Sequence, residues 1–212
     1  MVKDSPWMDR LSFIFSLIVV IATGLWIWQQ GALRVNLTEQ TNGNWYLERS
    51  AGITAYSLLL ISVVWGIAVT SRVVKDWSPG VLSMLLHSTI SWLAVVFSLT
   101  HALLLLLDKY VPYTLADILI PFTGPYRPLA VGLGTLAFWI GLIVAASFSI
   151  KKRLGQRAWK ALHLTSYVAF GLVTAHALLA GTDAAHIGFQ ILLALGVLLV
   201  IALLAYRVRK AA

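Results

Sequence analysis

Six long stretches of the chain contain no charged residue, and they constrain the fold more than any other feature of the sequence. Each is long enough to cross a bilayer as a helix, because a hydrocarbon core of about 30 Å needs about 20 helical residues. Helix is expected since lipid cannot hydrogen-bond the open backbone groups of other structures. We therefore predict an all-α integral membrane bundle of six helices, a single transmembrane domain over residues 1–212. The helices are expected at about 11–33, 50–71, 81–107, 128–150, 161–181 and 184–206.

The composition agrees with a membrane protein and excludes several classes. Hydrophobic residues make up 59% of the chain and charged residues 11%, which leaves too little polar surface for a soluble enzyme. The sequence has no cysteine, so disulfides, iron–sulfur clusters and thiolate-ligated haem are excluded. A net charge of +8 would suggest nucleic acid as the partner of a soluble protein. In a membrane protein the distribution of charge across the bilayer matters more, and we expect no nucleic-acid partner.

Lysine and arginine are distributed unevenly between the two sides of the predicted bundle. Twelve of the 16 lie on the side of both termini, and four lie on the other side. The positive-inside rule therefore puts both termini in the cytoplasm of a multi-pass cell-membrane protein, expected in the bacterial cytoplasmic membrane with lipid as a partner. The third and fifth spans then both run outward and are parallel to each other. In the second outer loop, residues 113–122 are expected to form a short interfacial helix.

Four histidines are the only ionisable side chains well inside the predicted spans. His87 and His101 lie in the third span, and His163 and His176 lie in the fifth. All eight acidic residues lie outside the spans or at their edges, which argues against an ion pump or a cation channel. An imidazole without a partner in hydrocarbon costs about 2–7 kcal/mol, so each of the four requires a partner. Coordination to a metal supplies one.

The histidines also match in depth, because the third and fifth spans are parallel. His87 and His163 follow the cytoplasmic ends of their helices, and His101 and His176 precede the outer ends. Separations of 14 and 13 residues place the two levels about 21 Å and 19.5 Å apart at about 1.5 Å per residue. Haem is ligated axially by imidazole and has an apolar macrocycle. We therefore expect two haem b groups, with His87 and His163 as the inner iron ligands and His101 and His176 as the outer ones, forming an electron path across the membrane.

The rotation along the fifth span fits this arrangement less well. At about 100° per residue, the two imidazoles of the third span lie only about 40° apart around the helix axis, whereas those of the fifth span lie about 140° apart. Gly171, between the two histidines, would permit a bend or a π-bulge. Alternatively, the two haems approach this helix from different sides.

Other interpretations of the histidines give a different function. They would be polar packing contacts in a non-redox transporter or an assembly subunit. They would hold a chlorin in an auxiliary pigment-binding subunit, although each magnesium usually takes a single protein ligand, so that paired levels would be unnecessary. His186, at the outer start of the sixth span, has no counterpart and is interpreted as an interfacial residue.

Together with further motifs, the histidines resemble those of the ferric reductase-like transmembrane domain, a family that includes ferric reductases, NADPH oxidases and the haem-binding membrane subunit of the methionine sulfoxide reductase system. Its hallmark is His-x13-His on one helix and His-x12-His on another, and this chain has both. The similarity extends from about Tyr46 to Asp183. Further matches are Arg49-x-x-Gly52-x-x-x-Tyr56 and the run from Leu154-Gly155 through Trp159 to Leu162-His163.

The resemblance implies two b-type haems that carry electrons from the cytoplasmic to the outer side. Ferric reductases and NADPH oxidases continue into FAD- and NADPH-binding domains, whereas this sequence ends six residues after Tyr206, so direct oxidation of NADPH is not expected. The chain would be the transmembrane electron-transfer component of an oxidoreductase, with no residue assigned to catalysis. The donor would be a cytoplasmic flavoprotein, a quinol or a noncovalent flavin. The outer acceptor would be a ferric chelate, dioxygen or an exported redox partner.

Basic residues at the ends of the spans are candidate partners of the haem propionates. Arg49 and Arg127 lie near the outer face, and the arginine fork matches a carboxylate. Snorkelling at the interface explains these two residues equally well, and explains Arg72, Arg157 and Lys160 at the inner face better. The basic run over residues 151–160 is interpreted as a topogenic loop on anionic lipid, which is compatible with docking of an acidic flavoprotein.

Overall fold

The computed structural model describes residues 6–29, 42–74, 78–108 and 110–211, and six long helices account for most of them. All six are long and apolar enough to cross a membrane, which confirms the predicted number of long apolar helices in the described part of the chain and fits a membrane protein. The long helices are α1 (Pro6–Gln29), α2 (Asn42–Thr70), α3 (Gly80–Leu104), α5 (Pro128–Ser147), α7 (Gln156–Leu179) and α8 (Ile187–Ala211). Short helical turns join them: η1 (Leu105–Leu107), α4 (Leu115–Leu119), η2 (Phe148–Ile150), α6 (Lys151–Leu154) and η3 (Thr182–Ala185).

Several helices begin or end beyond the predicted bounds. The predicted spans end at charged residues, whereas the helices continue past them. Asp9 lies within α1, Glu48 and Arg49 lie within α2, and α8 continues through Lys210. A charge does not end a helix at the membrane interface, because a long side chain can place its charged end in water while the backbone stays helical. Residues 30–33 of the first predicted span lie outside the described residues.

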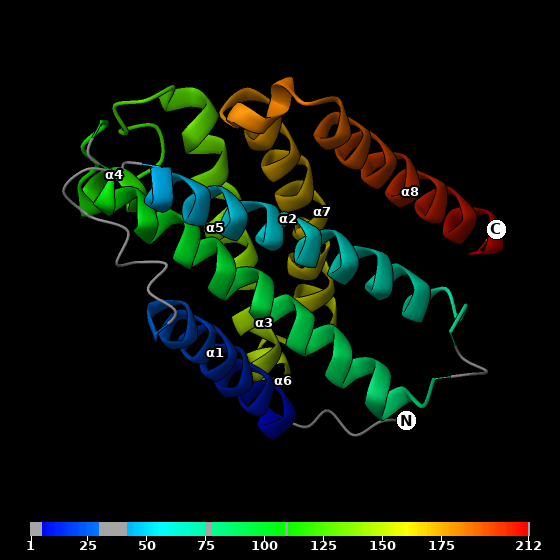
Figure 1. The fold of residues 1–212 in the computed structure, drawn as a ribbon. Helices are drawn as coiled ribbons and strands as arrows, with labels where there is room; N and C mark the ends of the chain where they lie inside the picture. The colour runs from blue at the N-terminus through cyan, green and yellow to red at the C-terminus, as the bar shows by residue number, and fades with distance from the viewer. Residues whose placement is uncertain (1–5, 30–41, 75–77, 109, 212) are drawn as a thin grey trace.

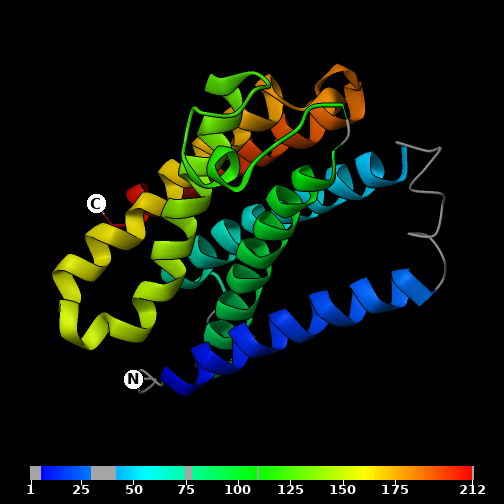
Figure 2. The ribbon, with the colours of Figure 1, turned by 90° about the vertical axis from the view of Figure 1, so that its left-hand side faces the viewer.

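Four of the long helices surround a central space. The helix α3 packs against α2 and α5, and α7 packs against α5 and α2, so that α3 and α7 face each other diagonally. The helix α1 packs on the outside of α3, and α8 packs on the outside of α2 (Figure 1). In Figure 2 the start of α1, α6 and the end of α8 lie at one end of the bundle, and α3 and α7 run in the same direction. We call the two ends of the bundle the α6 end and the α4 end.

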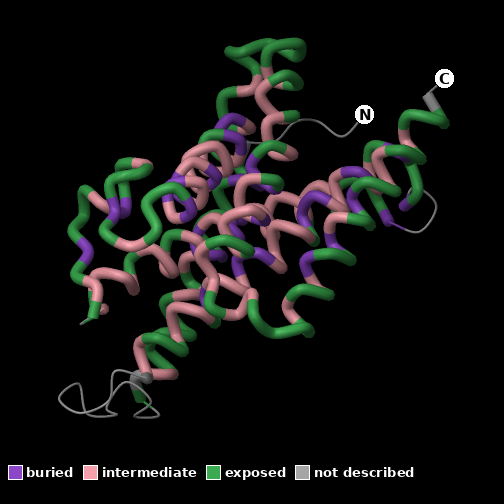
Figure 3. Tube along the Cα trace, turned by 90° about the horizontal axis from the view of Figure 1, so that it is seen from above, coloured by how far each residue is buried: buried purple, intermediate pink, exposed green. Residues whose placement is uncertain are grey.

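The main apolar core lies between α2, α7 and α8, and buried residues lie mainly where helices meet (Figure 3). Tyr56 and Phe170 stack there with ring centroids 5.9 Å apart. The helix α8 comes close to α2 because Gly196 has no side chain: a Cβ there would lie 3.0 Å from Leu60. The other core residues are Val63, Ile67, Leu193 and Val200.

The contact between α1 and α3 is polar instead. Ser12 and Ser16 of α1 are almost fully buried, and Thr89 of α3 donates a hydrogen bond to the Ser12 hydroxyl over 3.1 Å. Asp9 is buried as well, although the sequence placed it outside the first span. The side chain of Asp9 is held by three hydrogen bonds, from the Ser88 hydroxyl at 2.9 Å, the Trp92 indole at 2.9 Å and the Ser149 hydroxyl at 2.8 Å.

Candidate functional site

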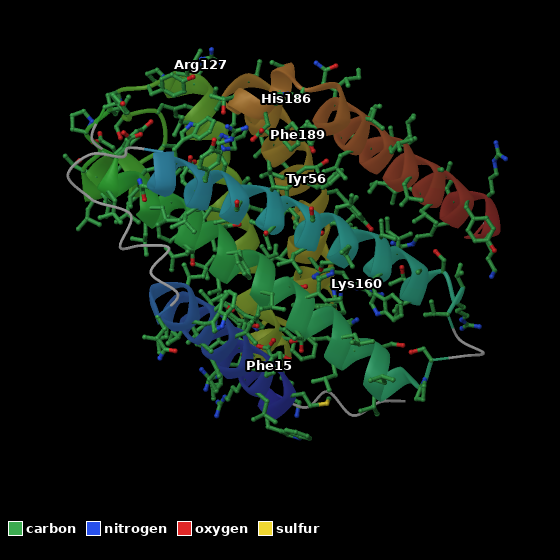
Figure 4. The ribbon with its side chains drawn as sticks, in the orientation of Figure 1. Phe15, Tyr56, Arg127, Lys160, His186 and Phe189 are labelled. Carbon is green, nitrogen blue, oxygen red and sulfur yellow. The ribbon has the colours of Figure 1, made fainter. Side chains whose placement is uncertain are left out.

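The four histidines of α3 and α7 meet in two pairs across the space between these helices. The ring centroids of His87 and His163 are 6.0 Å apart, with an angle of 69° between the ring planes. Those of His101 and His176 are 6.2 Å apart, at 74°. These are the two pairs that the sequence spacing predicts, the first toward the α6 end and the second toward the α4 end. His186 is exposed near the start of α8 at the α4 end of the molecule (Figure 4).

Three of the four rings are oriented by a hydrogen bond at Nδ1. His101 Nδ1 lies 2.9 Å from the Glu48 carbonyl oxygen, and His176 Nδ1 lies 2.9 Å from the Ala130 carbonyl oxygen. Since a carbonyl oxygen only accepts, both rings carry their proton on Nδ1 and leave the Nε2 lone pair free to bind a metal. His87 Nδ1 lies 3.4 Å from the Ser62 hydroxyl. A hydrogen bond at one ring nitrogen is typical of metal-binding histidines, which bind the metal through the other nitrogen.

Glycines on α2 and α5 allow the same three rings to lie against the helix backbone. A Cβ on Gly52 would lie 2.9 Å from His101 Nδ1, and one on Gly134 would lie 2.8 Å from His176 Nδ1. A Cβ on Gly66 would lie 3.1 Å from His87 Cε1. Gly52 and Gly66 are separated by the same number of residues as His87 and His101. That repeated interval is the signal that could have identified Gly66, which the sequence argument missed.

His163 is held differently. Its ring has no hydrogen-bond partner among the residues that the structure describes, and it stacks on Trp159 with centroids 4.9 Å apart and an angle of 24°. The ring of His176 therefore lies against α5, whereas that of His163 lies against its own helix. The helix α7 stays α-helical from Gln156 to Leu179, so no π-bulge occurs at Gly171. The two histidine rings of α7 therefore lie against different helices, although α7 itself stays regular.

One cavity of about 810 Å³ connects the two pairs, and all four histidines line it. Its middle part is apolar, with Leu59, Val95, Ala169 and Val173 among the lining residues. Charged residues line it as well, and these are Asp9, Glu48, Arg49, Asp108, Lys160, Asp183 and Arg207. Arg207 of α8 is a residue that the sequence argument did not connect with the site. Its Nη1 lies 3.5 Å from the Tyr167 hydroxyl, to which it donates a hydrogen bond.

The segment between η1 and α5 covers the α4 end of the cavity. The predicted short helix is present as α4, shorter than expected, and begins with a capping box between Thr114 and Asp117. Hydrogen bonds from Thr114 lower the pKa of the Asp117 carboxyl below its ordinary value. The Trp139 indole of α5 fixes the segment by donating to the Leu119 carbonyl oxygen over 2.9 Å. Tyr113 lines the cavity, and burial raises the pKa of its hydroxyl.

Arg49 and Arg127, at the α4 end, both have protein partners. Arg49 makes two hydrogen bonds to the Asp183 carboxylate, one of them from Nε over 2.8 Å, and its guanidinium lies 3.8 Å from the centroid of the Trp45 ring. Arg127 donates from Nη1 to the Leu179 carbonyl oxygen over 2.5 Å. Arg49 lines the cavity and Arg127 is not among its described lining residues, so Arg49 is the better placed of the two to meet a bound carboxylate.

The described residues contain no group of three or more His, Asp or Glu side chains that could hold a metal ion. Structural zinc sites take four protein ligands and catalytic ones three. Two imidazoles at each level instead match the number of axial positions on a haem iron. The donor set therefore fits an axially ligated haem better than a metal ion held by protein alone.

A family model described as a domain of unknown function (DUF8596) matches residues 44–183. The matched region begins in the first turn of α2 and ends in η3, so it contains all four paired histidines and the three glycines that contact them. No curated protein and no solved structure matches the chain.

Proposed function

The chain belongs to the DUF8596 family, and we propose that it is a di-haem b-type membrane cytochrome that carries electrons across the membrane, similar to the ferric reductase-like domain. His87 and His163 would hold the haem at the α6 end, and His101 and His176 the haem at the α4 end. The observation that carries the proposal is the pair of facing imidazoles at each of two levels of one cavity.

The separation of the rings supports axial ligation. If both rings bind one metal from opposite sides, their centres are separated by two metal–nitrogen bonds of about 2 Å and by the distance from the binding nitrogen to the centre of each ring. This sum is about 6 Å. The observed centroid distances of 6.0 Å and 6.2 Å agree with that sum. Direct hydrogen bonding between two imidazoles would require a nitrogen of each ring to come within about 3 Å of the other. No such bond joins either pair in the described part of the chain.

The other residues of the cavity support the same group. When bound, haem supplies an iron that accepts and donates single electrons. The apolar middle of the cavity would contact the macrocycle, and Lys160 would be available to its propionates, whereas Arg49 would have to exchange the Asp183 carboxylate for a propionate. Two histidine ligands leave no open axial position, so transfer to a separate acceptor is favoured over chemistry at the iron.

The charge distribution supports a direction for the proposed transfer. The α6 end carries most of the lysine and arginine, and we place it in the cytoplasm together with both termini. A cytoplasmic flavoprotein or a quinol would deliver electrons to the His87 and His163 level. An acceptor on the outer side would receive them from the His101 and His176 level.

The test is a count of haem in the purified protein, with a reduced-minus-oxidised absorption spectrum. We expect about two protohaems per chain. Colourless protein from cells with ample haem would contradict the proposal in favour of packing histidines, and an extracted chlorin would favour a pigment-binding subunit. His101→Ala and His176→Ala should each remove the same haem and spare most of the other, and His87→Ala and His163→Ala should do the converse.

The exposed His186 provides the matched control, since His186→Ala removes an imidazole outside both pairs. We expect it to retain both haems. Loss of the same haem in His87→Ala and in His176→Ala would contradict the assignment of the two levels.

A further inference from the structure

We infer that Trp159 is the positioning residue of the inner level: by stacking on His163, it sets the orientation of the one ligand ring that no protein hydrogen bond orients. This inference rests on the proposed function and adds a residue to it. Trp159 lies near the start of α7, on the wall of the cavity.

The contrast between the four rings is the first step of the argument. His87, His101 and His176 each have an oxygen of the protein within 3.4 Å of Nδ1. Their rings also lie against glycines, which leave little room for rotation. His163 has neither constraint in the described residues. A ligand ring that rotates freely about its side-chain bonds would leave the angle between the two axial imidazoles undefined, so some other contact must fix it.

The stack with Trp159 supplies that contact. The centroids of the two rings are 4.9 Å apart and their planes differ by 24°, which is an offset-stacked geometry. The two residues are one helical turn apart on α7, so their side chains leave the same face of the helix. Trp159 therefore moves with His163 when the helix moves, and it acts on the ring without contacting the metal.

The indole is itself fixed by neighbours from the preceding turns. Phe148 of η2 meets it edge to face, with centroids 6.2 Å apart, and Lys151 Nζ of α6 lies 4.4 Å from its centroid. A cation over an indole face is attracted to the ring. The short connection η2–α6 therefore holds the indole, and the indole holds the ligand ring.

The indole nitrogen provides an independent observation. Trp159 Nε1 is buried and has no hydrogen-bond partner among the described residues. The orientation of the indole is thus set by packing and stacking, in contrast to Trp65, Trp92 and Trp139, whose indole nitrogens all donate to protein oxygens. A buried donor is normally paired, so Trp159 differs from these three tryptophans in being held, within the described residues, by its ring contacts alone.

The experiment uses two substitutions that separate stacking from hydrogen bonding. Trp159→Phe keeps an aromatic ring and removes the indole nitrogen, and Trp159→Leu removes both. Each is made in the full chain carrying His101→Ala, so that the inner haem alone is observed. The readout is the electron paramagnetic resonance spectrum of the oxidised protein, because the g values of a low-spin ferric haem depend on the angle between the two imidazole planes.

We expect Trp159→Leu to shift and broaden the signal of the inner haem, because His163 then loses the contact that holds its plane at 69° to His87. Trp159→Phe should retain the position of the signal. Trp26→Leu is the matched control: it removes an exposed tryptophan of α1 that is not among the described lining residues of the cavity, and it should leave the inner signal unchanged.

An unchanged inner signal in Trp159→Leu would overturn the inference. An equal shift in Trp159→Phe and Trp159→Leu would also overturn it, since the indole nitrogen and not the stack would then be responsible. Either result, in a protein whose wild type binds two haems, leaves the proposed function intact. Wild-type protein without haem overturns both.

Discussion

At the scale of single residues, the absence of a side chain is as important in the site as the imidazoles. An added Cβ would lie 3.1 Å or less from the nearest atom of a histidine ring at three glycines, Gly52, Gly66 and Gly134. Such contacts are shorter than nearly all real Cβ contacts, so even alanine would push the ring. The glycines therefore determine how near α2 and α5 come to the ligands, and through them the width of the slot between α3 and α7.

Gly134→Ala should weaken binding of the outer haem. The added methyl group would displace His176, whose Nδ1 also bonds to the Ala130 carbonyl oxygen on the same helix. Overpacking of this kind costs about 1–3 kcal/mol, which corresponds to about 5- to 150-fold weaker affinity. The measurement is haem titration of the apoprotein, with the two levels distinguished by histidine variants. Gly171→Ala is the control, because a Cβ there would meet nothing within 4 Å; equal loss of haem in both variants would contradict the prediction.

At the scale of elements, the six long helices divide into four that form the slot and two that lie outside it. The helix α8 is joined to the slot through an apolar core, whereas α1 is joined to α3 through serines, a threonine and a buried carboxylate. In lipid, apolar side chains gain little by leaving one apolar surface for another, so polar contacts are the specific part of such an interface. Asp9 is the centre of that contact, since it also reaches Ser149 of η2.

Asp9→Ala should loosen α1 without emptying the site. Ser88, Trp92 and Ser149 would lose their acceptor, and each buried donor left without one costs about 1–3 kcal/mol. We therefore expect the free energy of unfolding in detergent to fall by at least the cost of one unpaired donor, about 1–3 kcal/mol. Protease cleavage after α1 should also become faster. Asp9→Asn keeps one acceptor oxygen and should lie between the variant and the wild type. Full loss of both haems with unchanged stability would show that Asp9 belongs to the site and not to the attachment of α1.

The elements also show what the sequence could and could not predict. Hydropathy predicted the number of long apolar helices, because a bilayer would impose a minimum length on every apolar segment that crosses it. The pairing of the four histidines could be predicted from their depth along two parallel helices, because depth depends only on distance along the chain. The pairs are His87 with His163 and His101 with His176. The positions of Gly66 and Trp159 against the rings depend on which helices are neighbours and how they are rotated. Span lengths contain no such information, and neither residue was assigned to the site.

At the scale of the whole molecule, both levels of histidines lie in one cavity that extends along the bundle. Electrons could cross a membrane through this protein only if the two histidine levels lie one above the other between the two membrane faces. The orientation of the bundle would then decide which level receives electrons from the donor. The α6 end contains the basic run over residues 151–160, and the α4 end contains the short helix that covers the cavity. From the charge distribution we propose that the α6 end faces the cytoplasm.

That orientation can be tested directly, because the chain contains no cysteine and a single introduced thiol reports its own location. Lys152 at the α6 end and Ala116 at the α4 end are both exposed. In intact cells we expect a membrane-impermeant maleimide to label Ala116→Cys, and to label Lys152→Cys only after the membrane is opened. The reverse pattern would invert the bundle, so that the level of His101 and His176 would face the cytoplasmic donor. Labelling of both thiols from outside would contradict a transmembrane position of the two histidine levels, and no electron path across the bilayer would remain.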